Sequence, residues 1–338
     1  MKKIILLLLI GTAFSCKNMQ SVASKDNSDP TKYIKSISEK DLKKMLYVVA
    51  SDEMEGRETG SKGQKKAGLY MIEQYKKSGI SFPKGATDYY QHIPAAFLNA
   101  RRNENLPDSE NIWAYIEGSE KPDEVLVISA HYDHVGIQKG EIYNGADDDG
   151  SGTVAVIEMA KAFAKAKKQG HGPKRSILFL HVTGEEHGLH GSRYYSENPL
   201  FPIANTITDI NIDMIGRRDV EHAQTNNYVY VIGADRLSSD LHNIVVAQNE
   251  KYTKIDLDFK FNDPKDPNHF YERSDHYNFA KHGIPSVFFF NGVHEDYHGK
   301  GDEPEKIEYD ALTKRTKLAF SIAWELANRE NRPVVDKK

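Results

Sequence analysis

Two histidines and three acidic residues of the kinds that bind divalent metals recur along this chain, most of them just beyond an apolar, strand-like run. In order they are His131, Asp148, Glu186, Asp213 and His298. Two imidazoles and three carboxylates suffice for two cations if one carboxylate bridges them and each cation keeps an open position for water. The set therefore predicts a two-metal site with hydrolytic chemistry.

Two further acidic residues stand beside these predicted ligands. Glu185 precedes Glu186, so one carboxylate can bind metal while its neighbour stays free to take up a proton. Asp133 stands two residues after His131. Its carboxylate could accept a hydrogen bond from the second ring nitrogen of His131, which would fix the histidine tautomer for metal binding.

A glycine-framed turn carries three adjacent acids, Asp147, Asp148 and Asp149. Neighbouring carboxylates repel one another, so this cluster indicates a cation nearby. A solvent-exposed acidic turn is the alternative explanation.

Other hydrolytic sites are not supported by the sequence. His187 and His190 form a His-x-x-His pair, but we expect them to shape the loop after Glu186 and not to bind zinc. The chain has no His-Glu-x-x-His string, which excludes a thermolysin-type single-zinc site. It has no Gly-x-Ser-x-Gly elbow, and its only cysteine is Cys16, so serine and cysteine nucleophiles are not expected.

Buried strand patterns alternate with helix patterns along the chain. Strands are expected at 112–116, 125–128, 177–180, 207–212, 228–232 and 287–290; helices are expected from Ser38 onward and at 61–77, 151–168, 239–250 and 310–329. This order predicts an α/β fold, a three-layer α/β/α sandwich with a mixed, mostly parallel central sheet and helices on both faces. Ligands bind beyond the carboxyl ends of strands in such sheets. His131, Glu186 and Asp213 follow strands in this way, which is the main physical reason to treat them as one site.

Composition and charge bound the class of protein. The chain has 338 residues, of which 39% are hydrophobic and 28% charged, as in a globular protein. Its net charge of −4 gives no reason to expect nucleic acid as a partner. The segment 254–271 carries several aromatics that could line a substrate pocket, although core packing is the preferred explanation for any one of them. These are Phe259, Phe261, Phe270 and Tyr271.

The N-terminus predicts export and anchoring. Two lysines precede the apolar run 4–10, which is too short to span a bilayer, and Cys16 follows at the expected cleavage point. This resembles a bacterial lipoprotein signal; an ordinary signal peptide with an incidental cysteine is the alternative. We therefore expect a signal peptide at 1–15, a lipidated Cys16 with a flexible tether to residue 30, one catalytic domain at 31–330 and a tail at 331–338. The protein would be extracytoplasmic and lipid-anchored to a bacterial membrane.

Six strings in this order resemble family twenty-eight of the metallopeptidases, the co-catalytic zinc aminopeptidases related to bacterial leucyl and Streptomyces-type enzymes. They are His131-Tyr132-Asp133, Asp147-Asp148-Asp149-Gly150-Ser151-Gly152, Gly184-Glu185-Glu186, Asn211-Ile212-Asp213-Met214-Ile215-Gly216, Ser274-Asp275-His276 and Asp296-Tyr297-His298. The resemblance runs from about Asp41 to the closing helix.

By this resemblance the chain would hold two zinc ions, with cobalt or manganese as possible substitutes. His131 and Asp213 would bind one ion, Glu186 and His298 the other, and Asp148 would bridge them. A cis peptide would follow Asp148, as in relatives. The stretch from 111 to 131 leaves no room for the extra domain that some relatives insert.

The resemblance also implies catalytic roles. Glu185 would be the general base of an aminopeptidase acting on peptides with a free N-terminus. Tyr297 is the better candidate for oxyanion stabilisation, since Arg273 stands where some relatives have a tyrosine before the Ser-Asp-His string.

Two other functions remain open at this stage: a glutaminyl-cyclase-like acyltransferase with one zinc, and a binding module of the same fold without catalysis. Retention of both metal half-sites argues against each. Neither the side-chain preference nor the group that recognises the substrate amine can be predicted from the sequence.

Overall fold

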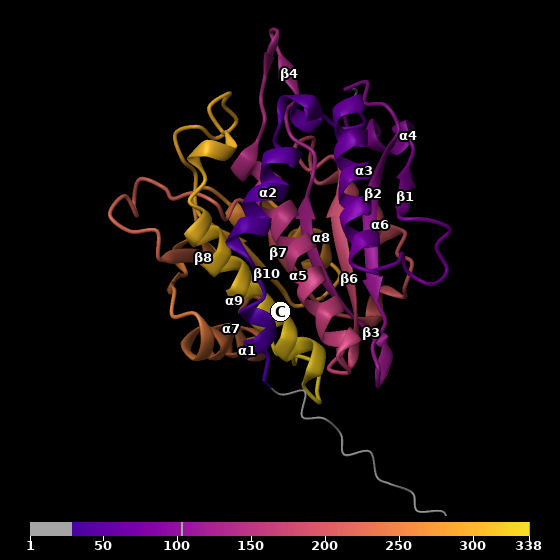
Figure 1. The fold of residues 1–338 in the computed structure, drawn as a ribbon, viewed down its shortest axis with the longest axis vertical. Helices are drawn as coiled ribbons and strands as arrows, with labels where there is room; N and C mark the ends of the chain where they lie inside the picture. Colours follow the sequence, from indigo (N-terminus) through magenta and orange to yellow (C-terminus); the bar gives the residue numbers. More distant parts are fainter. Residues whose placement is uncertain (1–28, 103, 338) are drawn as a thin grey trace, which may run out of the picture.

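The computed structural model describes residues 29–102 and 104–337 (Figure 1). Within them the centre is one sheet of eight strands. In spatial order these are β1 (Tyr90–Ile93), β2 (Ser109–Ile116), β6 (Arg175–Val182), β3 (Lys121–His131), β7 (Thr206–Ile212), β10 (Ser286–Phe290), β8 (Tyr228–Ile232) and β9 (Asp256–Asp258).

The four middle strands, β6, β3, β7 and β10, run parallel to one another. Antiparallel pairings join β1 to β2, β2 to β6 and β10 to β8, and β9 pairs parallel with β8. The middle strands are buried on both faces because both faces are covered, and β3, β6 and β10 carry continuous apolar runs, whereas β7 includes the buried polar residues Thr208, Asp209 and Asn211. Along β3, Leu126 and Ile128 pack into one hydrophobic cluster, while Val125 and Val127 pack into another on the opposite side.

Helices cover the sheet on both faces, as Figure 1 shows. One face carries α1 (Thr31–Ile34), α2 (Glu39–Val49), α3 (Lys62–Lys77), α5 (Gly152–Lys168), α7 (Ser239–Tyr252) and α9 (Tyr309–Asn328); the other carries α6 (His190–Glu197) and α8 (His276–Ala280). The predicted α/β/α sandwich with a mixed sheet is therefore confirmed.

Local signals set the helix starts that the sequence indicated. The Ser38 side chain accepts a hydrogen bond from the Asp41 amide at the start of α2, and Ser61 accepts one from the Gln64 amide at the start of α3. Near the end of α3, Gly79 takes a positive φ of 72°. These caps explain why the predicted boundaries lie close to the observed ones.

Smaller elements complete the fold. The short helix α4 (Ala95–Leu98) follows β1, and a hairpin of β4 (Ile137–Gln138) and β5 (Glu141–Ile142) projects from the upper end of the molecule in Figure 1. Only residues 117–120 separate β2 from β3, so a short turn joins the two strands.

The predicted signal peptide, Cys16 and nearly all of the predicted tether lie outside the described residues. Among the helices of the described part, none has the length and apolar character needed to cross a membrane.

Candidate metal centre

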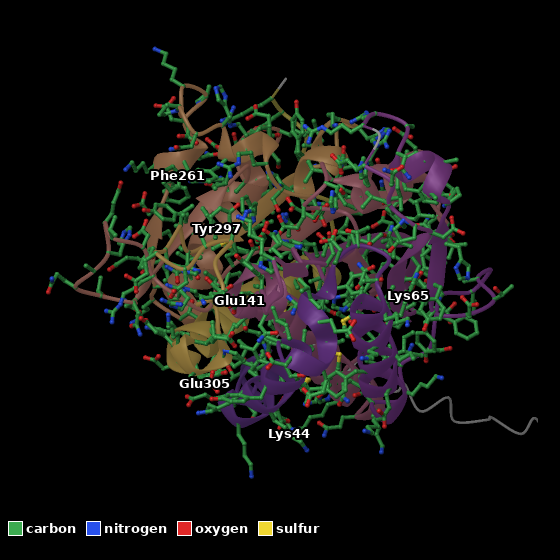
Figure 2. All side chains as sticks on the ribbon, turned by 90° about the horizontal axis from the view of Figure 1, so that it is seen from above. Lys44, Lys65, Glu141, Phe261, Tyr297 and Glu305 are labelled. Atoms are coloured by element: carbon green, nitrogen blue, oxygen red, sulfur yellow. The ribbon has the colours of Figure 1, made fainter. Side chains whose placement is uncertain are left out.

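The predicted metal ligands meet at the carboxyl edge of the parallel strands. His131 is the last residue of β3, the Glu185-Glu186 pair follows β6, and Asp213 follows β7. Asp148 lies in the turn before α5, and His298 lies in the loop after β10. Figure 2 looks onto this end of the molecule, with the neighbouring Tyr297 near the middle of the view. The topology thus brings together five residues that are up to 167 positions apart, from 131 to 298.

Three of these residues form the first half-site, which we define as His131, Asp148 and Asp213. The His131 Nε2 atom lies 3.2 Å from Asp148 Oδ1 and 3.5 Å from Asp213 Oδ1. Burial by itself would lower the pKa of His131, but the carboxylates of Asp213 and Glu185 raise it well above its usual value. The Ser274 hydroxyl donates to Asp213 Oδ2 at 2.6 Å, which leaves Oδ1 directed at the histidine.

The second half-site consists of Asp148, Glu186 and His298. His298 Nε2 lies 3.1 Å from Asp148 Oδ2 and 2.9 Å from Glu186 Oε2. Asp148 therefore offers one carboxylate oxygen to each half-site, which is the arrangement of a bridging ligand. Although burial opposes ionisation, the imidazoles of His131 and His298 hold the pKa of Asp148 well below its usual range.

These distances fit a pair of divalent cations. Ligand atoms about 2.0–2.2 Å from one tetrahedral ion lie roughly 3.3–3.6 Å from each other. The observed separations within the half-sites, from 2.9 to 3.5 Å, are close to that range. Nitrogen and carboxylate ligands without thiolates suit zinc and also accept cobalt or manganese.

The acidic turn gives its three carboxylates different tasks. Asp147 Oδ1 accepts a hydrogen bond from the Gly216 amide at 2.6 Å. Asp149 Oδ1 accepts hydrogen bonds from the Met214 and Gly152 amides at 3.0 and 2.9 Å. Both side chains are thus used to hold the backbone, and of the three only Asp148 faces the half-sites. The predicted cis peptide is present between Asp148 and Asp149.

Two buried groups fix this turn in place. The Asp302 carboxylate accepts hydrogen bonds from the amides of Asp147 and Asp148 at 3.0–3.1 Å. The Arg57 guanidinium, fully buried, donates to the carbonyl oxygens of Tyr132 and Gly145 at 2.9 and 2.8 Å. Arg57 thereby ties the segment after His131 to the turn that carries Asp148. Neither residue carries a sequence signal for this role, since both act through backbone contacts.

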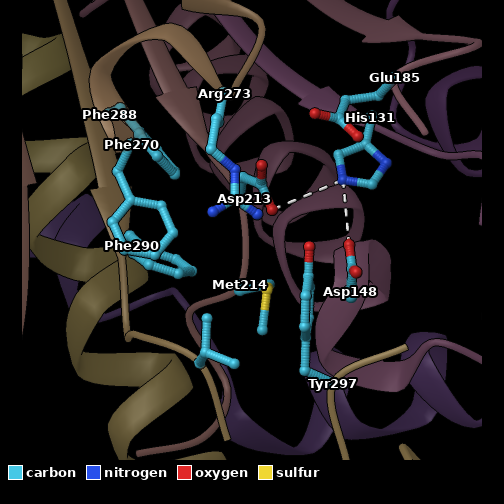
Figure 3. Close-up of a pocket in the computed structure, with 11 residues that line it drawn as sticks. His131, Asp148, Glu185, Asp213, Met214, Phe270, Arg273, Phe288, Phe290 and Tyr297 are labelled. Carbon is cyan, nitrogen blue, oxygen red and sulfur yellow. Dashed lines mark ion pairs between the residues drawn. The ribbon is translucent and has the colours of Figure 1, made fainter. Parts of the chain in front are cut away.

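Glu185 lines a pocket beside the first half-site without joining it (Figure 3). Burial raises the pKa of its carboxyl group well above the usual value. Among the described residues, the Glu185 carboxylate makes no hydrogen bond or ion pair, whereas its amide donates to Asp133 Oδ1 at 3.3 Å. The group is held by its backbone and its side chain is left available for a proton.

An apolar wall faces this carboxylate across the pocket. Figure 3 shows Phe270, Phe288 and Phe290 on one side, Glu185 with His131 on the other, and the Tyr297 hydroxyl pointing toward the half-sites. Of the four aromatics in the 254–271 segment, Phe270 alone lines this pocket, while Phe261 packs behind it at a ring distance of 4.7 Å. Phe270 is thus a pocket residue, whereas Phe261 belongs to the packed aromatic cluster behind it.

Arg273 brings a cation to the same pocket. Its guanidinium carbon lies 4.8 Å from the centre of the Phe270 ring, and no carboxylate of the described residues is within ion-pair distance. A cation with free hydrogen-bonding groups therefore faces the space between the apolar wall and the metal ligands.

One predicted contact was wrong. His131 Nδ1 is 3.1 Å from the backbone carbonyl of Asp133 and 3.8 Å from its carboxylate, so the carbonyl is the hydrogen-bond partner. The Asp133 carboxylate is already engaged by the Thr59 hydroxyl at 2.9 Å and by the Glu185 amide. The tautomer is still fixed, but by the main chain.

Of the His-x-x-His pair, His187 holds the loop after Glu186 through its contacts, whereas His190 is the first residue of α6. The two ring nitrogens of His187 contact Glu104 and Glu58 at 2.5 and 2.7 Å, while His190 is buried beside Arg193. Neither histidine belongs to a metal-type cluster within the described part of the chain.

One further histidine, not predicted from the sequence, lies at this site. His134 is fully buried, and its Nδ1 atom lies 2.8 Å from Glu186 Oε1 and 3.7 Å from Asp148 Oδ2. With those two carboxylates it forms a second metal-type cluster. Its position three residues after His131 was the available signal.

Comparison with known proteins agrees with this geometry. Residues 111–323 match the model of peptidase family M28. A probable zinc metalloprotease of Pyrenophora tritici-repentis is 25% identical over 271 residues, which cover 66% of this chain and 52% of that protein. A probable leucine aminopeptidase of Trichophyton verrucosum is 29% identical over 228 residues, 64% of this chain and 57% of that protein. The chain thus spans about half the length of the curated relatives it matches.

Solved structures share the fold at low sequence identity. The LapA aminopeptidase of Legionella pneumophila superimposes with a TM-score of 0.67 at 20% identity, covering 91% of this chain and 77% of that one. The glutaminyl cyclase of Porphyromonas gingivalis superimposes with a TM-score of 0.63 at 16% identity, covering 85% and 97%. Both likenesses concern the fold alone, because one fold carries both activities.

Proposed function

The chain belongs to peptidase family M28, and from this premise we propose that it is a metal-dependent exopeptidase that removes N-terminal residues from peptides. The observation that carries the proposal is the shared carboxylate. Asp148 directs one oxygen to His131 and the other to His298, so the two half-sites form one centre for two cations. A site for a single zinc would not need this arrangement.

The cations, when bound, supply Lewis acidity that polarises the scissile carbonyl and lowers the pKa of an attacking water. Side chains of the protein carry out the proton transfer and shape the pocket. Glu185 takes a proton from that water and returns it to the leaving amine. Burial raises the pKa of this carboxyl group, so it holds a transferred proton more readily than an exposed glutamate does. The phenylalanine wall excludes water on the opposite side of the pocket.

Tyr297 is the proposed donor to the developing oxyanion. It lines the pocket, and its ring stacks on His298 at a centroid distance of 4.0 Å, which fixes the direction of the hydroxyl. Burial raises the pKa of this phenol, so it keeps its proton and can donate a hydrogen bond.

A substrate comparison tests the proposal. The purified protein, reconstituted with zinc, is given an aminoacyl amide, the same compound with an acetylated amine, and a peptide with N-terminal glutamine. We expect hydrolysis of the free-amine substrate and little or none of the blocked one. Cyclisation of the glutamine peptide without hydrolysis of the aminoacyl amide would favour the glutaminyl-cyclase-like alternative, and absence of both reactions would favour a binding module.

We also propose where the enzyme is located in the cell. The basic and apolar start of the sequence and Cys16 support an exported, lipid-anchored protein whose catalytic domain comprises residues 31–330. Its partners would be peptide substrates with a free N-terminus, and the membrane would be contacted only through the anchor.

A further inference from the structure

His134 is a buried imidazole without a hydrogen-bond partner. Its ring is 0% exposed, and neither ring nitrogen makes a hydrogen bond. Buried polar side chains almost always have a partner, and a missing one calls for an explanation such as an ion. His134 Nδ1 is also only 2.8 Å from Glu186 Oε1, another buried atom without a hydrogen bond. The two atoms are close but not aligned as donor and acceptor.

Such a pair has the geometry of two ligands directed at a common point. His134 Nδ1 is 3.7 Å from Asp148 Oδ2, the oxygen that Asp148 offers to the second half-site. The rings of His134 and His298 lie 5.7 Å apart at 68°, so the two imidazoles approach the same carboxylates from different directions. Each imidazole is nearest to a different oxygen of Glu186.

The ring of His134 cannot turn away easily. A Cβ atom at Gly145, which has a φ of +54°, would lie 2.5 Å from its Cγ and Cδ2 atoms, so the glycine makes room for the ring. The His134 amide donates to the Arg57 carbonyl at 3.2 Å. The fold therefore holds the imidazole against the second half-site, whereas the His298 side chain is 40% exposed.

We infer that His134 supplies an additional nitrogen ligand, through Nδ1, to the cation held by Glu186 and His298. The second half-site would then have two imidazoles, one buried and one exposed, and the first only one. This inference rests on the proposed two-metal function and extends it, because it makes the two cation positions unequal in ligand number. If the exposed His298 side chain moved away from the second cation, His134 would still hold that cation.

The test measures metal binding, not turnover. Metal-free wild-type protein and His134→Leu are titrated with zinc, and the two dissociation constants and the stoichiometry are measured by calorimetry and elemental analysis. We expect His134→Leu to bind the first cation normally and the second at least about 10²-fold more weakly, because losing a direct ligand should cost at least as much as losing a group that only supports one. His181→Leu is the matched control, since His181 is equally buried but bonded to Tyr75. It should bind both cations as the wild type does.

Further variants keep the inference testable if leucine disturbs the fold. His134→Asn can place an amide oxygen near the position of Nδ1 and should recover part of the affinity. His134→Ala should be rescued by added imidazole. Cobalt placed in the second position reports ligand number through its visible spectrum, which should change in His134→Leu.

The outcomes separate the two claims. A wild type that never binds two cations would overturn the proposed function itself. A wild type with two cations and a His134→Leu variant with unchanged affinities would overturn only the inference. Loss of both cations in His134→Leu, or an unchanged cobalt spectrum, would also contradict it, because His134 would then act through Asp148 or Glu186 and not as a ligand of one cation.

Discussion

Replacing Glu185 by glutamine should separate proton transfer from metal binding. The substitution keeps the size and shape of the side chain, and the backbone bond from the Glu185 amide to Asp133 is unaffected. The amide cannot take a proton as a carboxylate does. Because the Glu185 carboxylate makes no hydrogen bond or ion pair with another described residue, the fold should tolerate the change.

The expected loss of activity follows from the proposed role of Glu185 as general base. General acid–base catalysis contributes about 10²–10⁴-fold, equivalent to roughly 2.7–5.4 kcal/mol of barrier. We therefore predict that kcat of Glu185→Gln falls by at least about 10²-fold while KM changes little. Both cations and the thermal stability should be retained.

The assay combines steady-state hydrolysis of an aminoacyl substrate with elemental analysis of the same preparation. Glu186→Gln is the matched control, since it changes the neighbouring carboxylate and should weaken metal binding at the second half-site. Normal turnover by a fully metallated Glu185→Gln protein would refute the assigned base, even if the fold and the metals were correct.

The other predictions concern the acidic turn, the anchor and a buried histidine. Asp148→Asn should weaken the binding of both cations, whereas Asp147→Asn should keep both cations bound and mainly lower the stability of the protein. Elemental analysis of the two variants measures this difference. The reverse pattern would show that Asp147, and not Asp148, is the bridging ligand. Cys16→Ser should release the protein from the membrane fraction, and a salt-resistant membrane association in that variant would contradict lipid anchoring. His181, whose pKa burial lowers to about 3, should bind a proton more readily when unfolded. It therefore adds stability that is present above about pH 6.5 and is lost as the pH falls toward 3, by up to about 1.4 kcal/mol per unit. Unfolding in chelator should show a shallower slope for His181→Gln, and an equal slope would contradict this.

The large elements could be predicted because their signals are local and strong. The middle strands β3, β6 and β10 contain continuous apolar runs, and Ser38 and Ser61 cap the helices that follow these two serines. Elements of a few residues, such as β1, β9 and α8, were not predicted. Their sequences are short and partly polar, so tertiary contacts and not local patterns decide their structure.

The site was predicted as far as its residues follow buried strands. His131, Glu186 and Asp213 were placed by that rule, and the structure brings Asp148 and His298 to them. The sequence could not indicate which atoms of these residues contact one another. Asp133 uses its backbone carbonyl and not its carboxylate toward His131, and Asp302 supports the acidic turn from 154 residues away. Such contacts depend on the tertiary fold.

His134 could not be predicted as a metal ligand for the same reason, although it directly follows the His131-Tyr132-Asp133 motif. It stands directly after Asp133 and three residues after His131, but this spacing alone does not distinguish a ligand from a packed histidine. Only the approach of Glu186 Oε1 to 2.8 Å and the absence of a hydrogen bond identify it.

A zinc titration of the metal-free protein, with bound metal and aminoacyl hydrolysis measured at each step, tests the central claim most directly. A shared Asp148 between two half-sites predicts that activity reaches its maximum at about two ions per chain and disappears with chelator. Full activity at one ion per chain, or activity that survives complete removal of metal, would contradict the two-cation centre.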